Sequence, residues 1–158
     1  MQDLKNFHKV LAIGLLASLV ASAAHAAPDE GKCVTLTRGF WIDVFGKKNA
    51  DAAAKYITEN YIQHSAPPQP DGKHWIETWR GVYANPPYGV GVDFPEGSKD
   101  FNTEIVSLVG DDTFAVLEAH DTGTYDHGVN VGKTIDSHYW DIFRCENGRV
   151  VEHWFSPG

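Results

Sequence analysis

Positive charge, cysteine and long apolar runs are all scarce in this sequence of 158 residues. Its 13 Lys and Arg residues are outnumbered by 21 Asp and Glu residues, and the formal net charge is −8. Proteins that bind nucleic acid or anionic membrane surfaces need a basic surface, so neither partner is expected. Hydrophobic residues make up 42% of the chain and charged residues 22%, which is typical of one globular domain.

Motifs for several familiar chemistries are also missing. The sequence contains no glycine-rich phosphate loop and no Gly-x-Ser-x-Gly elbow, so nucleotide binding and serine hydrolysis are not expected. Its histidines form no short His-x-x-x-His pair, which is the spacing typical of helical metal ligands. We therefore expect no metal site and no cofactor.

The longest apolar run lies near the N-terminus. Val10 to Ala24 (VLAIGLLASLVASAA) follows two lysines and ends in a small-x-small pattern at Ala24-His25-Ala26. This arrangement predicts a secretory signal peptide over residues 1–26, cleaved before Ala27. The run is shorter than the roughly 20 residues of a bilayer span. We therefore expect an exported protein, periplasmic or secreted, with no stable membrane anchor after cleavage.

The remaining chain is expected to contain a flexible lead-in over residues 27–34 and a single domain over residues 35–158. Its two cysteines are Cys33 and Cys145. In an oxidising compartment they can form a disulfide bond, but the sequence equally allows two separate thiols. Neither lies in an activating motif, so a cysteine nucleophile is not expected.

Helical patterns occupy the first half of this domain. Apolar residues recur at helical spacing, and the third of these segments carries a broad aromatic face. A proline- and glycine-rich stretch, residues 86–99, follows and predicts a long loop that is the best lid candidate in the chain. The expected helices are residues 35–46, a helix from a capping Asn49 to Tyr56, and a helix from Asp71 to Tyr83.

From Phe101 onward the pattern changes to segments rich in β-branched and aromatic residues. Hairpin turns are expected at residues 110–112 and 146–148, the second with an Asn-Gly pair. Three helices followed by antiparallel strands predict an α+β domain, with the helices on one side of a curved sheet that encloses a pocket. The expected strands are residues 101–109, 113–120, 134–144 and 149–155.

Two segments of the chain resemble the SnoaL-like polyketide cyclase family of the nuclear transport factor 2-like superfamily. Asp51 to His64 (DAAAKYITENYIQH), followed by a proline-rich loop, is similar to the entry region of that family. Trp140 to Trp154 (WDIFRCENGRVVEHW) is similar to its terminal hairpin, although Phe155 stands where the family often has Asp. The resemblance implies a cone of three N-terminal helices on a strongly curved antiparallel sheet with a central pocket. It also implies a homodimer formed through the open face of the sheet.

For activity, the resemblance implies a small-molecule ligand and cofactor-free acid–base chemistry of the cyclase, isomerase or dehydratase type. In such chemistry a base removes a proton next to a carbonyl group. The fold also includes non-catalytic binding proteins, which is the alternative interpretation. A carboxylate and an imidazole within hydrogen-bond reach inside the pocket would favour the enzyme, and a pocket lined only by aromatic residues would favour the binding protein.

Asp141 is the first candidate for the base. On a regular strand it shares a face with Tyr139 and Phe143. A carboxylate between two aromatic residues is either a functional group in the pocket or one half of a buried ion pair. Asp136 is the rival candidate, and its other interpretation is a solvated turn residue.

Three histidines are candidate partners of Asp141. His64 lies either at the cavity mouth or in a position that braces the loop by a backbone hydrogen bond. His153 is expected to share an alternating face with Val151 and Phe155, and points inward or is structural. His120 belongs to the preceding strand, where it is catalytic or a polar strand-end residue.

A set of large aromatic side chains is expected to fill the core or to line the pocket. Aromatic rings in a pocket can stack on a flat ligand. The candidate substrate-binding residues are Tyr61, Trp75, Trp79, Tyr83, Tyr139 and Phe143.

Overall fold

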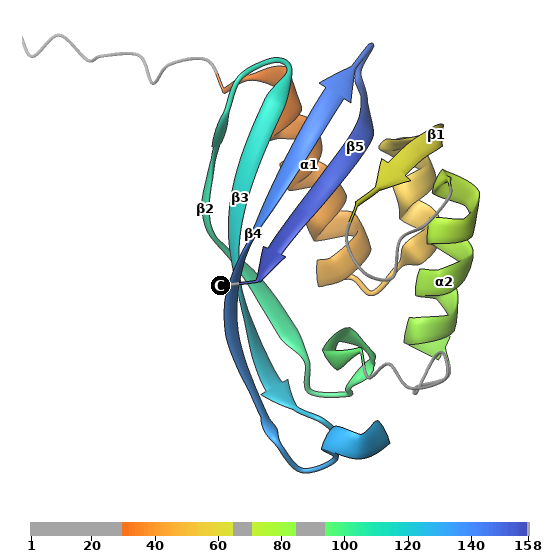
Figure 1. The fold of residues 1–158 in the computed structure, drawn as a ribbon, viewed down its shortest axis with the longest axis vertical. Helices are drawn as coiled ribbons and strands as arrows, with labels where there is room; N and C mark the ends of the chain where they lie inside the picture. The colour runs from red at the N-terminus through yellow and green to blue at the C-terminus, as the bar shows by residue number, and fades with distance from the viewer. Residues whose placement is uncertain (1–29, 65–70, 85–93, 158) are drawn as a thin grey trace, which may run out of the picture.

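The computed structural model describes residues 30–64, 71–84 and 94–157. Figure 1 shows helices gathered on one side of a curved sheet of five strands. The expected signal peptide, the loop at residues 65–70 and most of the lid candidate lie outside the described residues. Within the described ranges, no helix is both long enough and apolar enough to cross a membrane.

The first helix, α1 (Lys32–Trp41), continues directly into a π-helical turn, Ile42–Gly46. The helix expected over residues 35–46 is therefore present, but it begins earlier, at Lys32. Cys33 and Val34 are buried in the core, and this burial holds the first turn of the helix on the sheet. Residues 32–34 belong to the domain, and their assignment to a flexible lead-in was wrong.

The second expected helix is a short 3₁₀ helix, Ala50–Lys55. Within the described residues, the Asn49 side chain makes no capping hydrogen bond to it, so the expected cap was wrong. The backbone carbonyl of Asn49 accepts a hydrogen bond from the Ala52 N–H instead, at 3.1 Å. Ala52 and Ala53 are buried, because their small side chains let this turn pack closely on the core.

The third helix, α2 (Gly72–Ala84), begins where expected. Asp71 caps it, since its Oδ1 accepts a hydrogen bond from the His74 N–H at 2.9 Å. Gly72 lies so close to the first strand that an added Cβ would be 2.3 Å from the carbonyl oxygen of Thr58. Only glycine permits this approach, which holds the start of the helix against the edge of the sheet.

The sheet contains all four expected strands and one more. Its order is β1-β5-β4-β3-β2, and β1 runs parallel to β5 whereas every other pair is antiparallel. The sheet is therefore mixed, because the chain passes through α2 and three strands between β1 and β5, which is long enough for a parallel connection. The strands are β1 (Ile57–Gln63), β2 (Asn102–Gly110), β3 (Phe114–Thr124), β4 (Thr134–Glu146) and β5 (Arg149–Pro157).

The face of the sheet toward the helices is defined by the buried residues that alternate along β3 from Ala115 to Asp121 and along β4 from Tyr139 to Cys145. Buried residues on β4 include Tyr139, Asp141 and Phe143, as the sequence pattern predicted. On β5 a bulge opposite Arg144 and Cys145 shifts the alternation. Val150 is consequently the buried residue, whereas Val151 lines an outer groove beside Arg144 and does not share the face of His153 as expected.

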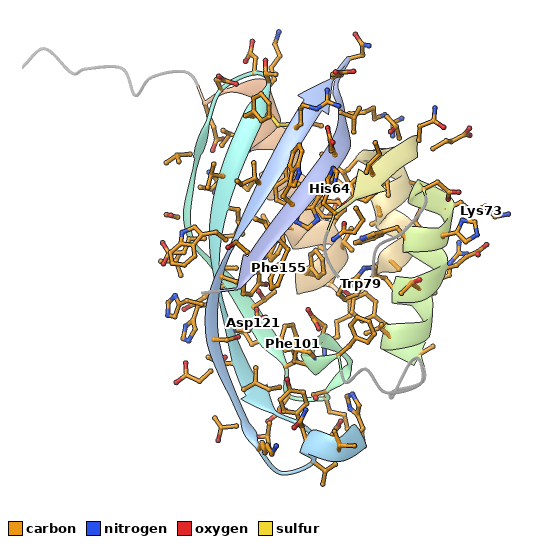
Figure 2. All side chains as sticks on the ribbon, viewed as in Figure 1. His64, Lys73, Trp79, Phe101, Asp121 and Phe155 are labelled. Carbon is orange, nitrogen blue, oxygen red and sulfur yellow. A yellow bond between two sulfur atoms is a disulfide. The ribbon has the colours of Figure 1, made fainter. Side chains whose placement is uncertain are left out.

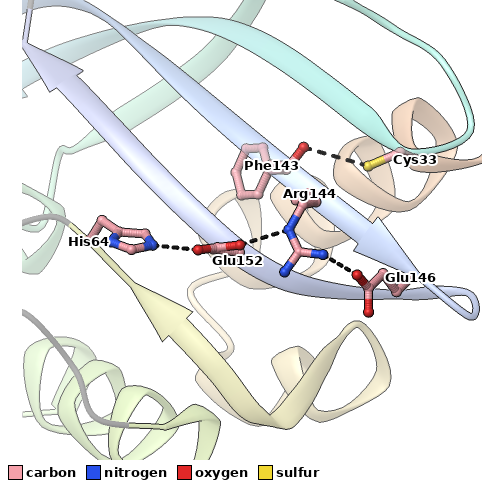
Figure 3. A network of polar contacts seen from close by, with 6 residues as sticks. All are labelled: Cys33, His64, Phe143, Arg144, Glu146 and Glu152. Carbon is pink, nitrogen blue, oxygen red and sulfur yellow. Dashed lines mark hydrogen bonds and ion pairs between the residues drawn. The ribbon is translucent and has the colours of Figure 1, made fainter.

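Cys33 and Cys145 form a disulfide bond, with their Cα atoms 5.6 Å apart. The bond joins α1 to β4, and both residues are buried. The Cys33 Sγ also lies 3.8 Å from the carbonyl oxygen of Phe143 (Figure 3). A disulfide sulfur carries no hydrogen, so this second contact is packing.

Candidate active site

Asp141 and His153 form a buried carboxylate–imidazole pair on the inner face of the sheet. The Asp141 Oδ1 lies 2.8 Å from the His153 Nε2. Asp141 is 2% exposed and His153 is 7% exposed, so the pair is nearly closed to solvent. The His153 ring stacks on Phe143 with centroids 4.4 Å apart and planes 3° apart, and this stacking fixes the plane of the imidazole.

The other ring nitrogen of His153 is also held. Its Nδ1 lies 2.8 Å from the Gln63 Oε1, and the Tyr61 hydroxyl donates a hydrogen bond to the same oxygen at 2.5 Å. With that amide oxygen as the acceptor, Nδ1 carries a hydrogen and Nε2 faces the carboxylate. Asp141 and His153 can therefore share one proton. The chain of contacts joins β1, β5 and β4, so three strands set its geometry.

A second buried polar pair lies on the same face. The Tyr139 hydroxyl donates a hydrogen bond to the Asp121 Oδ1 at 3.1 Å. Asp121 is 3% exposed, and burial, reinforced by the charge of Asp141, raises its pKa to about 6. Burial also raises the pKa of Tyr139, and the charges of Asp121 and Asp141 raise it further.

Glu96 brings a third carboxyl group to this interior, from the 3₁₀ turn Pro95–Gly97. Its Oε2 is buried and has no hydrogen-bond partner among the residues that the structure describes. Burial raises the pKa of Glu96 to about 8, with smaller contributions from the charges of Asp121 and Asp141, whereas a hydrogen bond from its own backbone and the charge of Lys48 oppose the shift. Glu96 is therefore largely protonated at neutral pH.

Sequence reasoning missed both Asp121 and Glu96. Asp121 continues the buried alternation of Ala115, Leu117 and Ala119, so the period-2 pattern of β3 could have found it. Glu96 lies in a stretch rich in proline and glycine that shows no periodicity. Nothing in that local pattern distinguishes a buried carboxyl group from a solvated one.

Aromatic rings on α2 form a ladder that leads toward this interior. Trp79 lies 5.4 Å from Trp75, 5.7 Å from Tyr83 and 5.8 Å from Phe94, measured between ring centroids. Figure 2 shows Trp79 pointing from α2 toward the sheet, with Phe101 nearer to the strands. The helix therefore contributes an aromatic wall opposite the buried carboxyl groups.

The six predicted substrate-binding residues divide into two groups. Tyr61, Trp75 and Phe143 are at most 2% exposed and belong to the packed hydrophobic core. Trp79 and Tyr83 are only partly buried, and the Tyr83 hydroxyl has no hydrogen-bond partner within the described ranges. Tyr139 is 8% exposed and also belongs to the packed core, although its ring centroid lies 5.2 Å from that of the exposed Phe155. Trp79 and Tyr83 are therefore the two partly exposed members of the set.

His64 lies on the opposite face of β5 from His153. Its Nε2 is 2.7 Å from the Glu152 Oε1, and its ring stacks on Trp154 with centroids 4.8 Å apart. Its backbone N–H donates a hydrogen bond to the carbonyl of His153 at 2.9 Å, which continues the pairing of β1 with β5. The His64 side chain therefore contacts Glu152 and Trp154, and the structure does not bring it to Asp141.

The contacts of His64 extend into a surface network (Figure 3). The Arg144 Nε donates to the Glu152 Oε2 at 2.7 Å, and its guanidinium also contacts Glu146. Hydrogen bonds from His64 and Arg144 lower the pKa of Glu152. These residues alternate with the inward-facing ones, so the network covers the outside of the sheet.

His120 and Asp136 also lie on the outer face of the sheet. The His120 Nε2 is 2.9 Å from the Asp136 Oδ1, and the hydrogen bond to Asp136 raises the pKa of His120. The His120 ring stacks on His138 with centroids 4.3 Å apart. Alternation on β3 places His120 opposite to Asp121, so the structure does not bring it to the buried pair.

Two further features of the described residues bear on the site. No group of three or more His, Cys, Asp or Glu side chains in residues 30–64, 71–84 and 94–157 is arranged to hold a metal ion. A surface groove of about 370 Å³ lies between α2 and β1, lined by Ile57, Gly72 and Ile76. None of the buried carboxyl groups lines that groove, so it is separate from the site.

Helices on a curved sheet, with a carboxylate–imidazole pair on the inner face, define an α+β domain of the nuclear transport factor 2-like class. Residues 40–153 match the family model of the SnoaL-like domain, and the chain belongs to this family. A search of curated proteins finds no match.

Solved structures with the same fold have low sequence identity to this chain. IdmH, a candidate polyketide cyclase from Streptomyces antibioticus, is 18% identical over 77% of this chain and 88% of its own, with a TM-score of 0.56. A candidate polyketide cyclase from Acidithiobacillus ferrooxidans is 19% identical over 83% and 90%, with a TM-score of 0.61. An epoxide hydrolase from M. tuberculosis described as LEH-like is 9% identical over 84% and 83%, with a TM-score of 0.58.

Proposed function

We propose that this protein is an enzyme that uses Asp141 and His153 for cofactor-free acid–base chemistry on a small carbonyl-containing molecule. The observation that carries the proposal is the 2.8 Å contact between the two buried side chains. A carboxylate and an imidazole in hydrogen-bond reach inside a pocket are the groups that such chemistry requires. The reaction is of the cyclase, isomerase or dehydratase type.

In this proposal Asp141 is the general base. His153 hydrogen-bonds to its Oδ1, and in this proposal Oδ2 faces the ligand. Asp141 takes a proton from the carbon next to the carbonyl, and His153 stabilises the proton on the pair. The contact of His153 with Gln63 keeps the imidazole in one orientation through the reaction.

Two comparisons support a small-molecule substrate. IdmH is described as a candidate polyketide cyclase and another structural neighbour as an epoxide hydrolase, so this fold accommodates organic substrates in at least two reaction classes. The aromatic wall formed by Trp79 and Tyr83 suits a flat or cyclic ligand.

Proton exchange tests the reaction class without knowledge of the natural substrate. A panel of cyclic ketones and β-keto esters is incubated with the protein in D₂O, and exchange next to the carbonyl is followed by NMR. Asp141→Asn keeps the shape of the side chain and should slow exchange roughly 10²–10⁴-fold. Asp136→Asn is the matched control on the outer face and should exchange at the original rate.

The alternative outcome is equally specific. Bound ligand detected by native mass spectrometry, with no exchange on any compound and no effect of Asp141→Asn, would identify a non-catalytic binding protein. A retained ligand would then give the chemical class directly.

The proposal includes export and a homodimer. The disulfide bond suits an oxidising compartment, and the N-terminal sequence of protein recovered outside the cytoplasm should begin at Ala27. The outer face of the sheet exposes Phe114, Trp140 and Ile142 by 39–43%. Light scattering should give the mass of a dimer, and Ile142→Lys on this face should give a monomer.

A further inference from the structure

A groove of about 360 Å³ opens on the outer face of the sheet, and neither Asp141 nor His153 lines it. Small-molecule sites in proteins range from about 300 to 1,000 Å³, so the groove is large enough for a ligand of a few carbon atoms. One wall belongs to β1 and the other to the hairpin of β4 and β5. The groove is therefore separate from the buried pair on the inner face.

Irregular strand pairing accompanies this groove. Between residues 57 and 62 the chain of β1 advances five positions, whereas its partners on β5, Val150 and Glu152, are two positions apart. The surplus residues of β1 form a bulge, and a second irregularity between β4 and β5 turns Val151 outward, into the groove. Bulges redirect side chains and are frequent next to functional sites.

Arg144 lines the groove with a guanidinium group that is held in place. Its Nε donates a hydrogen bond to the Glu152 Oε2 at 2.7 Å, and its Nη1 contacts Glu146 (Figure 3). Glu152 is held in turn by His64, and its side chain is 16% exposed. A guanidinium carries five N–H donors, so Arg144 keeps donors that these carboxylates do not use. Because the group is already ordered, little conformational entropy is lost when it binds a further anion.

Arg149 brings a second guanidinium to the groove. Its Nη1 donates a hydrogen bond to the backbone carbonyl of Ala54 at 2.7 Å. Glu146 lies directly opposite on β4, but its carboxylate contacts Arg144. Within the described ranges Arg149 therefore has no carboxylate partner, although the chain has more acidic than basic residues. An anchored guanidinium with unused donors is suited to bind an anion.

The charges around the groove determine which anion fits. The formal charges of Arg144 and Arg149 are balanced by those of Glu146 and Glu152. A monoanion is therefore easier to accommodate than a phosphate dianion, and the net charge of −8 on the chain acts in the same direction. A carboxylate also matches the planar guanidinium, from which it accepts two parallel hydrogen bonds.

Two apolar side chains, Ile62 and Val151, line the groove together with the arginines. We infer that the groove is a second binding site, which takes a small organic carboxylate, with Arg149 as its main donor and Arg144 as the second. The hydrocarbon part of the ligand packs on Ile62 and Val151. This inference is independent of the proposed function, because it uses none of the groups on the inner face of the sheet.

Benzoate is a suitable probe, because it combines a carboxylate with a small apolar ring. It is titrated into ¹⁵N-labelled protein and followed by NMR, with benzamide as the uncharged control and inorganic phosphate as the control for negative charge alone. The backbone signals of Asn60, Asn147 and Arg149 should shift, with a dissociation constant of about 1 mM or tighter. Benzamide and phosphate should bind at least about tenfold more weakly. No shift at these residues, or equal binding of either control compound, would overturn the inference.

Substitutions of Arg149 test its role. Arg149→Gln should weaken benzoate binding by at least about tenfold, because it removes charge-assisted hydrogen bonds. Arg149→Lys keeps the charge without the planar fork and should lose part of the affinity. The matched control is Arg80→Gln, since Arg80 lines the other groove and is paired with Asp51 at 2.5 Å, and it should bind benzoate normally. Equal affinity in Arg149→Gln and in the original protein would contradict the assignment.

Two further variants separate this site from the other proposals. Ile142→Lys should bind benzoate as tightly as the original protein, because Ile142 does not line the groove. Binding by that variant alone would mean that a dimer covers the groove, and it would overturn a ligand site there. Asp141→Asn should bind benzoate normally, and Arg149→Gln should keep its rate of proton exchange, so each proposal can fail without the other.

Discussion

Asp141 and His153 are diagonal neighbours across an antiparallel strand pair. Phe143 lies directly opposite His153, and Phe155 lies directly opposite Asp141. The long imidazole crosses this diagonal, which is why its Nε2 reaches the carboxylate at 2.8 Å while its ring covers Phe143. The contact therefore depends on the register of β4 against β5, and a shift of either strand by one residue would turn its side chain to the outer face and separate the pair.

Removal of either partner of this pair should be more costly than removal of both. His153→Ala leaves the carboxylate of Asp141 buried without its partner, and we expect a loss of about 3–5 kcal/mol in the free energy of unfolding. The double variant Asp141→Asn with His153→Ala should lose less than His153→Ala alone, as measured by urea denaturation.

His64→Ala is the matched control for that cycle. His64 also contacts a carboxylate, that of Glu152, but its side chain is 39% exposed. An exposed pair contributes about 1 kcal/mol or less, so the loss should be small and exchange activity unaffected. Equal losses for His64→Ala and His153→Ala would show that the buried pair has no special contribution to stability.

Stability should fall as the pH rises from about 5 to about 8, because the pKa of Glu96 is about 8 in the folded protein and 4.5 in the unfolded chain. In that window the folded state keeps a proton that the unfolded state has lost. One such group lowers the free energy of unfolding by at most about 1.4 kcal/mol per pH unit. Urea denaturation across the range should show the slope, and Glu96→Gln should flatten it.

Other titratable groups determine the pH dependence of stability that should remain in Glu96→Gln. Asp121, with a pKa of about 6 against 3.8, adds a slope of the same sign in the lower part of the window. His120 adds the same sign at higher pH, since its folded pKa is raised from 6.5. The lowered pKa of Asp71 acts in the opposite direction, but only below its unfolded value of 3.8. An identical slope in Glu96→Gln would contradict the assignment of a buried neutral acid.

Reduction of the disulfide bond should destabilise the domain without unfolding its hydrophobic core. The bond spans 112 positions, and a loop of that length corresponds to about 4–5 kcal/mol of restricted chain entropy in the unfolded state. Cys33→Ala with Cys145→Ala should therefore lower the midpoint of urea denaturation. A midpoint equal to that of the oxidised protein would show that the bond contributes nothing to stability.

The fold could be predicted from the sequence because the hydrophobic period of each segment and the residues of each turn act locally. The alternation of Tyr139, Asp141 and Phe143 identified the inner face of β4, and the Asn-Gly pair of the last hairpin identified its turn. The parallel pairing of β1 could not be predicted in this way, since it joins Ile57 to Val150 across nearly the whole domain.

The candidate site was predicted only in part, for the same reason. Asp141 and His153 were both candidates, but their contact depends on strand register. A regular alternation also missed the bulge that moves Val151 outward. His64 and His120 are imidazoles that could pair with Asp141, but they lie on the outer face of the sheet. The residue type alone does not show which face a side chain occupies. Glu96 owes its protonation to neighbours from distant parts of the chain.

The two cysteines lie near opposite ends of the domain's sequence, one in its first helix and the other near the end of its fourth strand. A growing or translocating chain carries Cys33 as a lone thiol until almost all of the domain has emerged. With only two cysteines, a single chain can form no incorrect disulfide, so the one oxidation error available is a bond between two chains. An oxidised monomer has therefore folded far enough to bring α1 and β4 into contact.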